Sequence, residues 1–335
     1  METEVLQLHT RHPFIIARGG RSDYRTVWVR LTDGDGHEGW GEAAPSKFYG
    51  ESAETILAAL VVYADLLPAD PFDIEETEAR WAQLMRRNPA ARAALSSALH
   101  DLVGKRLGIP VYRLWGLDPA KAPRSTFTIG LDTPEKVRAK VLEAQEYPIL
   151  KIKLGTDQDE AILRTIRDAT DKEIRVDANC AWTVKHTIQM LPVLKEFGVT
   201  MLEQPLPPEA LDGLAEVTRR SEIPVIADES CETAADIPPL VGKVDGINIK
   251  LAKCGSLREA IRMIAIARAH GLLVMVGCMI ESSIAITAAA HFTPLVDIVD
   301  LDGAALLDND PFVGATIGGG QVSLPSGPGL GLRRR

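Results

Sequence analysis

The chain has 335 residues, which corresponds to about two domains of roughly 150 residues each. Its 46 acidic residues outnumber its 37 basic residues, and the net charge of −9 argues against a nucleic-acid-binding protein, which needs a basic surface to neutralise phosphates. Its 4 cysteines, none of them in a Cys-x-x-Cys pair, argue against a disulfide scaffold and against a zinc ribbon.

The first residues of the chain carry acidic side chains and no apolar stretch, so no signal peptide is expected. No run of about 18 apolar residues occurs that could cross a membrane. We therefore expect a cytoplasmic protein that contacts neither a membrane nor nucleic acid. The sequence does not decide the oligomeric state, and a homo-oligomer remains open.

Residues 1–118 are expected to form a small α+β domain. Two strand-like runs, residues 26–31 and 38–43, flank an Asp-Gly-Asp-Gly sequence, which is typical of a hairpin turn. Two helical patterns follow, over residues 52–66 and 89–106, and the second ends before a Gly-Ile-Pro stop signal. Strands followed by helices in this way indicate an α+β unit.

Short apolar runs recur along residues 119–310, and helix-length patterns lie between them. The eight runs begin 22 to 27 residues apart: 125–130, 149–154, 174–179, 199–204, 224–229, 246–251, 273–278 and 298–303. Strands and helices that alternate at this interval predict parallel pairing, and eight such units predict a closed (β/α) barrel. A doubly wound open sheet is the alternative, but the glycine-rich phosphate-binding sequence that usually accompanies it is absent. The tail, residues 311–335, is expected to return to the first domain.

Three acidic residues fall at the ends of consecutive predicted strands. In a parallel barrel the active site lies at the carboxyl ends of the strands. Asp177, Glu203 and Asp228 would lie there, at spacings of 26 and 25 residues. Barrel rims are often polar, so one acid alone would mean little, but three in consecutive repeats indicate a site for a hard divalent cation. Mg²⁺ is favoured over Zn²⁺ because neither His nor Cys joins the set.

Lysines lie on both sides of this predicted metal site. Lys151 and Lys153 are two residues apart on the second strand and so share one face, while Lys250 comes from the sixth strand, across the barrel. The closeness of two lysines and a cation is expected to lower a lysine pKa and to create a base at neutral pH. Bases on opposite sides of a metal suit the removal of a proton from one face of a carbon and its return to the other.

These strand-end residues resemble the enolase superfamily, and in particular its muconate lactonizing enzyme subgroup. The sequences DANCAW, MLEQPL, IADES and INIKLAKCGS are similar to that subgroup's strand-end motifs. The resemblance implies an α/β fold in which a capping domain precedes a (β/α)7β barrel of the TIM type. It also implies Mg²⁺ bound by the three carboxylates and Lys153 and Lys250 as the acid and base. Lys151 would then support the enolate charge and lower the pKa of Lys153.

The eighth strand carries Asp300-x-Asp302, which resembles the acidic pair with which dipeptide epimerases hold the free α-ammonium of their substrate. Two acids at this rim would suit a cation, although Asp300 could instead be a strand-end residue in contact with solvent. Glutamate-selective members carry an arginine in a capping-domain loop, at a position where this chain has Gly19. Arg18 and Arg21 lie close by and are candidate substrate-binding residues, in a loop expected to close over the site.

The resemblance therefore implies a Mg²⁺-dependent dipeptide epimerase, an isomerase that moves a proton at the α-carbon of the C-terminal residue of its substrate. The alternatives within the subgroup are an N-acylamino-acid racemase, an o-succinylbenzoate synthase and a cycloisomerase. Their substrates lack a free ammonium, so Asp302 argues against them. A barrel that binds a ligand without catalysis is the alternative from another class, and the complete set of bases and carboxylates argues against it.

Overall fold

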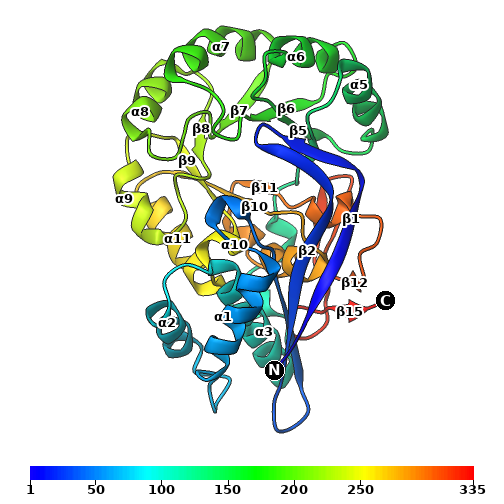
Figure 1. Ribbon diagram of the computed structural model, residues 1–335, viewed down its shortest axis with the longest axis vertical. Coiled ribbons are helices and arrows are strands. Elements are labelled where there is room, and N and C mark those ends of the chain that lie inside the picture. Colours follow the sequence, from blue (N-terminus) through cyan, green and yellow to red (C-terminus); the bar gives the residue numbers. More distant parts are fainter.

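Eight parallel strands form one continuous sheet in the computed structural model, which describes residues 1–335 (Figure 1). Each strand pairs with its neighbours in chain order, from β4 to β11. The strands are β4 (Phe127–Ile129), β5 (Ile149–Lys153), β6 (Glu173–Asp177), β7 (Val199–Glu203), β8 (Val225–Ala227), β9 (Gly246–Ile249), β10 (Leu273–Gly277) and β11 (Ile298–Asp300). Every predicted run overlaps one of these strands, so the predicted α/β barrel is confirmed.

Helices follow the strands and form an outer layer around the sheet (Figure 1). They are α5 (Pro134–Glu143), α6 (Asp159–Arg167), α7 (Val184–Glu196), α8 (Leu211–Arg220), α9 (Ile237–Leu240), α10 (Leu251–Cys254), α11 (Leu257–Ala269) and α12 (Ser283–Ala290). Short 3-10 helices complete the connections: η1 (Lys47–Tyr49), η2 (Pro119–Lys121), η3 (Ala234–Asp236), η4 (Thr293–Leu295) and η5 (Gly303–Leu306). No helix is both long enough and apolar enough to span a membrane.

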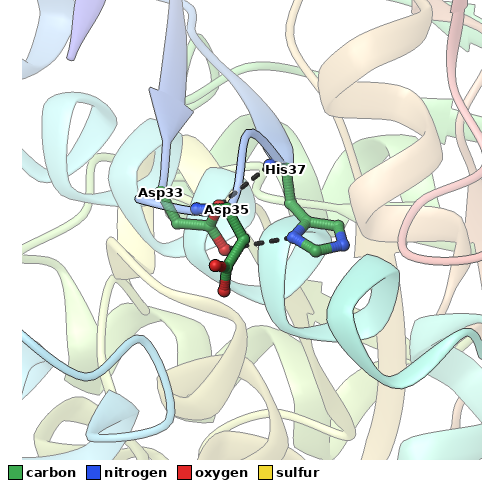
Figure 2. Close-up of side chains that lie close together, drawn as sticks. All are labelled: Asp33, Asp35 and His37. Atoms are coloured by element: carbon green, nitrogen blue, oxygen red, sulfur yellow. Dashed lines mark hydrogen bonds and ion pairs between the residues drawn. The ribbon is translucent and has the colours of Figure 1, made fainter.

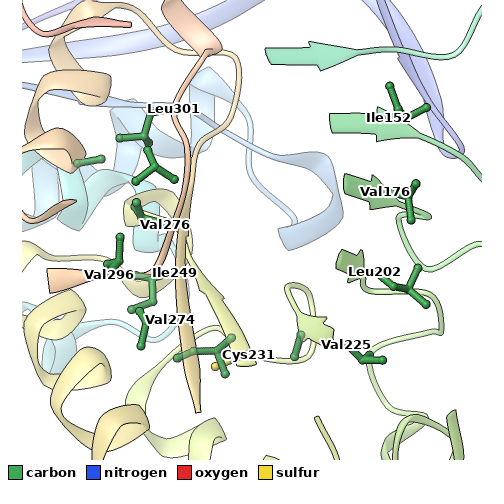
Figure 3. Close-up of a cluster of buried hydrophobic side chains, with 14 of the residues drawn as sticks. Ile152, Val176, Leu202, Val225, Cys231, Ile249, Val274, Val276, Val296 and Leu301 are labelled. Atoms are coloured by element: carbon green, nitrogen blue, oxygen red, sulfur yellow. The ribbon is translucent and has the colours of Figure 1, made fainter. Parts of the chain in front are cut away.

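The barrel strands present apolar side chains to the helices, and towards their carboxyl ends they present polar side chains to the interior, above the apolar cluster of Met201, Ile226, Met275 and Ile298. Ile152, Val176 and Leu202 belong to a core of 58 buried residues, and Figure 3 shows them side by side on successive strands. Side chains alternate along a strand, so Lys151 and Lys153, on either side of Ile152, face the opposite way. The alternation that builds the core therefore also delivers charged groups to the barrel interior.

The barrel closes between its first and last strands through a narrow seam. A single bridge joins Ser125 to Val299, and the Thr126 amide donates a hydrogen bond to the Val299 carbonyl at 3.1 Å. The hydroxyl of Ser125 accepts a hydrogen bond from the Leu301 amide at 2.9 Å. Side chains as well as the backbone ladder therefore hold this joint.

An antiparallel sheet and helices make up the N-terminal part. The sheet contains β1 (Glu2–Ile16), β2 (Gly19–Thr32) and β3 (Glu38–Ala43), and the helices are α1 (Ala53–Ala64), α2 (Ile74–Leu84), α3 (Pro89–Leu107) and α4 (Val111–Leu114). The sequence analysis did not predict β1, because this edge strand is largely exposed and has no continuous apolar run. In Figure 1 the β1–β2 hairpin, in blue, reaches across to the barrel strands β5 and β6.

Close packing joins β3 to α3. A Cβ atom on Gly39 would lie 1.9 Å from the Ala98 carbonyl oxygen, and one on Gly41 would lie 1.9 Å from that of Ala94. Only glycine permits this approach, because it has no side chain to separate helix and strand.

A buried carboxylate joins the N-terminal sheet to the barrel. Glu42 on β3 accepts hydrogen bonds from the amide and hydroxyl of Ser282, at 3.1 and 2.6 Å, where α12 begins. A negative charge is favourable at a helix N-terminus, so this contact fixes the sheet against the segment that follows β10.

The tail after residue 310 forms two short ladders, β12 (Phe312–Val313) with β15 (Arg333–Arg334) and β13 (Thr316–Gly318) with β14 (Gln321–Ser323). The Phe312 ring lies 5.3 Å from the ring of Trp40, and the Leu330 amide donates to Asp101 at 2.7 Å. The tail therefore contacts the N-terminal sheet and helix α3. The division into domains at residues 118 and 310 remains a prediction.

Candidate active site

Three buried carboxylates meet at the carboxyl ends of neighbouring strands. Asp177 ends β6, Glu203 ends β7, and Asp228 follows β8 directly. Each offers an oxygen atom that lies within 4.8 Å of the others, and none is more than 1% exposed. The structure thus brings together the three acids that the repeat spacing had indicated.

Each carboxylate faces a lysine. Lys153 Nζ lies 2.6 Å from Asp177 Oδ2, and Lys250 Nζ lies 2.7 Å from Asp228 Oδ2. Lys151 Nζ lies 2.7 Å from Glu203 Oε2. Since β5 and β9 are four strands apart in an eight-stranded barrel, Lys153 and Lys250 approach the carboxylates from opposite sides.

The electrostatics of the cluster depend on burial and on these pairs. Burial, followed by the charge of Asp177, raises the pKa of Glu203 to about 7. Burial also acts to raise the pKa of Asp228, but Lys250 and Lys253 outweigh it and hold this pKa well below its usual range. Glu203 is therefore the carboxylate most easily protonated at neutral pH.

The lysine pKa values differ from the expectation. Burial acts to lower the pKa of Lys151 and Lys250, but the carboxylates around them outweigh it and raise both above the usual value for lysine. The predicted lowering assumed that a divalent cation stands between the carboxylates. With the lysines themselves as the counter-ions, the carboxylates stabilise the protonated amines.

The sequence analysis assigned no role to two residues that hold the carboxylates in place. Lys253 is 1% exposed, and its ammonium donates to Asp228 Oδ1 at 2.6 Å and to the carbonyls of Asp228, Cys231 and Asn248 at 2.5 to 2.9 Å. The amide of Asn248 donates to Glu203 Oε1 at 2.8 Å. The only signal for either residue was its place next to Lys250, in a sequence that already resembled a strand-end motif.

The two acids of the eighth strand have different partners. Asp300 Oδ2 lies 2.7 Å from Lys151 Nζ, and the Thr126 hydroxyl donates to Asp300 Oδ1. Asp302 Oδ2 accepts a hydrogen bond from the Thr128 amide at 2.5 Å. Burial, followed by the charge of Asp300, raises the pKa of Asp302 to about 7. Asp300 is thus already paired with a cation, whereas Asp302 is not.

The lysines and the acidic pair line one pocket of about 350 Å³ beneath the β1–β2 hairpin. Arg18 and Arg21 also line it. Arg18 forms an ion pair with Glu229, at 2.7 Å, and the guanidinium of Arg21 lies over the ring of Tyr24 on its own hairpin, at 4.5 Å. The pocket therefore collects every predicted site residue apart from the three carboxylates, which lie directly behind its lysines.

A second acidic cluster lies in the turn between β2 and β3 and consists of Asp33, Asp35 and His37 (Figure 2). Asp33 Oδ1 accepts hydrogen bonds from the amides of Asp35 and His37, at 3.0 and 2.8 Å. The guanidinium of Arg106 lies 3.6 Å from the carboxylates of Asp33 and Asp35. These contacts are those of a hairpin turn closed by an aspartate, with its charge met by an arginine.

Comparison with known proteins agrees with this geometry. Residues 1–116 match the mandelate racemase / muconate lactonizing enzyme N-terminal domain, and residues 135–334 match the enolase C-terminal domain-like family. The chain is 44% identical to the L-Ala-D/L-Glu epimerase of Bacteroides thetaiotaomicron, over 98% of this chain and 86% of that protein.

Solved structures give the same result. A dipeptide epimerase from Enterococcus faecalis, in complex with Mg and L-Leu-L-Tyr, superposes with a TM-score of 0.94 at 32% identity, covering 99% of this chain and 98% of that one. An N-succinyl Arg/Lys racemase from Bacillus cereus also reaches a TM-score of 0.94, at 27% identity, covering 99% of this chain and 94% of that one. The chain belongs to the mandelate racemase / muconate lactonizing enzyme family of the enolase superfamily.

Proposed function

We propose that this chain is a Mg²⁺-dependent dipeptide epimerase, which inverts the α-carbon of the C-terminal residue of its substrate by 1,1-proton transfer. The observation that carries the proposal is the arrangement of Lys153 and Lys250 on opposite strands, with three carboxylates between them. The names of its relatives, an L-Ala-D/L-Glu epimerase and a dipeptide epimerase, support the same reaction.

The carboxylate cluster fits a hard divalent cation. All donors are oxygen atoms, they lie close together, and buried Glu203 Oε2 has the ammonium of Lys151, at 2.7 Å, as its polar partner. Asp177, Glu203 and Asp228 would hold the ion. When bound, Mg²⁺ would fix the substrate carboxylate, take up negative charge that develops on it, and offset the carboxylates that now raise the lysine pKa values.

Two lysines perform the proton transfer in this proposal. Lys153 Nζ, as a neutral amine, removes the α-proton from one face, and Lys250 Nζ, as an ammonium, donates a proton to the other face. The roles exchange for the opposite epimer. Lys151 keeps its positive charge between them and stabilises the negative charge on the substrate.

The amino end of the substrate is assigned to Asp302. No basic side chain forms an ion pair with Asp302, and Asp302 lines the same pocket as the lysines. A free α-ammonium would supply the missing cation. The N-succinyl Arg/Lys racemase has the same fold, so the fold alone does not distinguish a dipeptide substrate from an N-acylated amino acid. The unpaired charge of Asp302 is the feature that favours the dipeptide.

We also propose that residues 1–118, with the tail 311–335, cap the barrel of residues 119–310, and that Arg21 contributes to the pocket wall. A small-molecule substrate follows from the site. A homo-oligomer and a cytoplasmic location stay predictions.

The test is proton exchange in deuterated water. A set of L-Ala-X dipeptides, together with their N-acetyl analogues, is incubated with the enzyme and Mg²⁺, and deuterium at the α-carbon of X is measured by mass spectrometry. We expect incorporation together with inversion for free dipeptides. Exchange that is equal or faster for the N-acetyl compounds would favour an N-acylamino-acid racemase.

A further inference from the structure

Arg18 lies at the tip of the β1–β2 hairpin, and its guanidinium reaches the barrel. One nitrogen lies 2.7 Å from Glu229 Oε1, and another donates to the backbone carbonyl of Asn179 at 2.8 Å. Asn179 follows β6 and Glu229 follows β8, so a single side chain bridges the hairpin to the ends of two barrel strands.

The same guanidinium also contacts the second loop above the pocket. Its Cζ atom lies 4.5 Å from the centre of the Phe48 ring, within the range of a cation–π contact. Phe48 belongs to η1 and is itself 42% exposed. We define the lid as the hairpin tip, residues 17–22, together with the loop of residues 46–51. Arg18 is the residue on which both parts of the lid meet.

The buried charge of Glu229 is balanced by its contact with Arg18. Its side chain is 2% exposed, and its only ion pair is with Arg18. Its second oxygen, Oε2, has no hydrogen-bond partner. If a carboxylate on the substrate took Arg18 away, Glu229 would remain buried without a counter-ion, which is strongly unfavourable. The guanidinium of Arg18 is therefore held by groups of the protein and is not available to bind the substrate.

We propose that Arg18 is a positioning residue that latches the lid onto Glu229, and that it does not anchor a charged side chain of the substrate. The kinetic part of this inference rests on the proposed function. A latch acts on the fraction of molecules with a closed lid, so its loss raises KM for every dipeptide alike. An anchor for an acidic side chain acts on acidic dipeptides alone.

The first experiment is hydrogen–deuterium exchange of the full chain without substrate, in wild type, Arg18→Met and Glu229→Gln. Both variants should speed exchange about tenfold in peptides that cover the lid. The change should stop before Ile15, whose carbonyl accepts a separate hydrogen bond from the Leu131 amide at 2.8 Å. Arg21→Met is the matched control, because that guanidinium contacts its own hairpin, and it should leave exchange at residues 46–51 unchanged.

The double variant separates a shared latch from two unrelated effects. Arg18→Met combined with Glu229→Gln should exchange no faster than the faster single variant, because both changes break the same contact. Arg18→Lys should recover part of the protection, since an ammonium can meet Glu229 but cannot also reach Asn179 in the same fork. Additive effects, or exchange that Arg18→Met does not alter, would overturn the latch.

The second experiment compares L-Ala-L-Glu with L-Ala-L-Gln, which differ in charge and not in size. Arg18→Met should lower kcat/KM about tenfold for both, chiefly through KM. A loss confined to L-Ala-L-Glu would overturn the proposal and make Arg18 a substrate anchor. If wild type converts no dipeptide, the proposed function fails, whereas the exchange experiment still decides whether the latch exists.

Discussion

Asp302→Asn separates the recognition of the substrate amine from the support of the barrel. The Thr128 amide donates to one oxygen of Asp302, and an asparagine can keep this contact through its carbonyl oxygen. The other position then carries an NH2 group instead of a charged oxygen. The variant therefore retains the backbone contact and loses the partner for an ammonium.

The expected loss of activity follows from the burial of the pair. Asp302 is 3% exposed, so its contact with an ammonium is charge-assisted and largely removed from water. Such a contact is worth about 1.5–3 kcal/mol, and a tenfold change corresponds to about 1.4 kcal/mol. The kcat/KM for a free dipeptide should fall by roughly one to two orders of magnitude, whereas that for an N-acetyl analogue should change little.

The same substitution should stabilise the protein above neutral pH. Burial and the charge of Asp300 raise the pKa of Asp302 from 3.8 to about 7. A carboxyl group whose pKa is raised in the folded state contributes to the free energy of unfolding. This contribution is complete below pH 3.8 and is lost as the pH rises through about 7. At about 1.36 kcal/mol per pH unit, its loss is at most about 4 kcal/mol. If asparagine recovers half of this, about 2 kcal/mol, the melting temperature at pH 8 rises by about 3 °C.

The assay combines steady-state rates with melting curves at pH 5.5 and pH 8. The variant should lose activity on free dipeptides and should gain in Tm over wild type more at pH 8 than at pH 5.5. Equal losses on free and N-acetylated substrates would mean that Asp302 only supports the rim. A lower Tm at both values would show that its charge is satisfied in the folded protein, and would refute the electrostatic reasoning.

Three further predictions test the remaining site. Asp177→Asn should lower activity by more than about a hundredfold and abolish the rise in Tm on addition of Mg²⁺, because an amide is a weaker ligand for a hard cation; full turnover in EDTA would exclude the metal. Lys250→Met should stop epimerisation but leave deuterium exchange of one epimer, and Lys153→Met should leave exchange of the other; equal exchange of both epimers would contradict two bases. Lys253→Met should cost about 3–5 kcal/mol of stability, since it removes one of the two cations of buried Asp228 and the donor to three buried carbonyls, whereas the partly exposed Lys243→Met should change stability by less than about 0.5 kcal/mol.

The sequence predicts those site residues that recur at the same place in successive strand–helix repeats. Asp177, Glu203 and Asp228 could be aligned without coordinates, because each ends a strand one repeat after the last. Lys153 and Lys250 followed by the same rule, since strands four apart in an eight-stranded barrel face each other. The spacing of about 25 residues between strands, together with the closure of the barrel, is thus enough to predict that the carboxylates and lysines lie together.

Contacts that depend on the path of a loop could not be predicted from the sequence. Lys253 reaches Asp228 only because the four-residue helix α10 turns the chain back after β9. Arg18 meets Glu229 only because the hairpin is long enough to reach β8, and its edge strand β1 was itself too exposed to be predicted. The direction of the lysine pKa shifts also depends on whether lysines or a cation stand between the carboxylates, and the sequence does not decide this.

Side chains of the candidate site help to close the seam between β4 and β11. Its backbone bridge is supplemented by the contacts of Thr126 with Asp300 and of Thr128 with Asp302. Asp302, to which the amine of the substrate is assigned, therefore also helps to join the first and last strands of the barrel. A ligand that binds Asp302 more tightly when the seam is closed would therefore stabilise this closure.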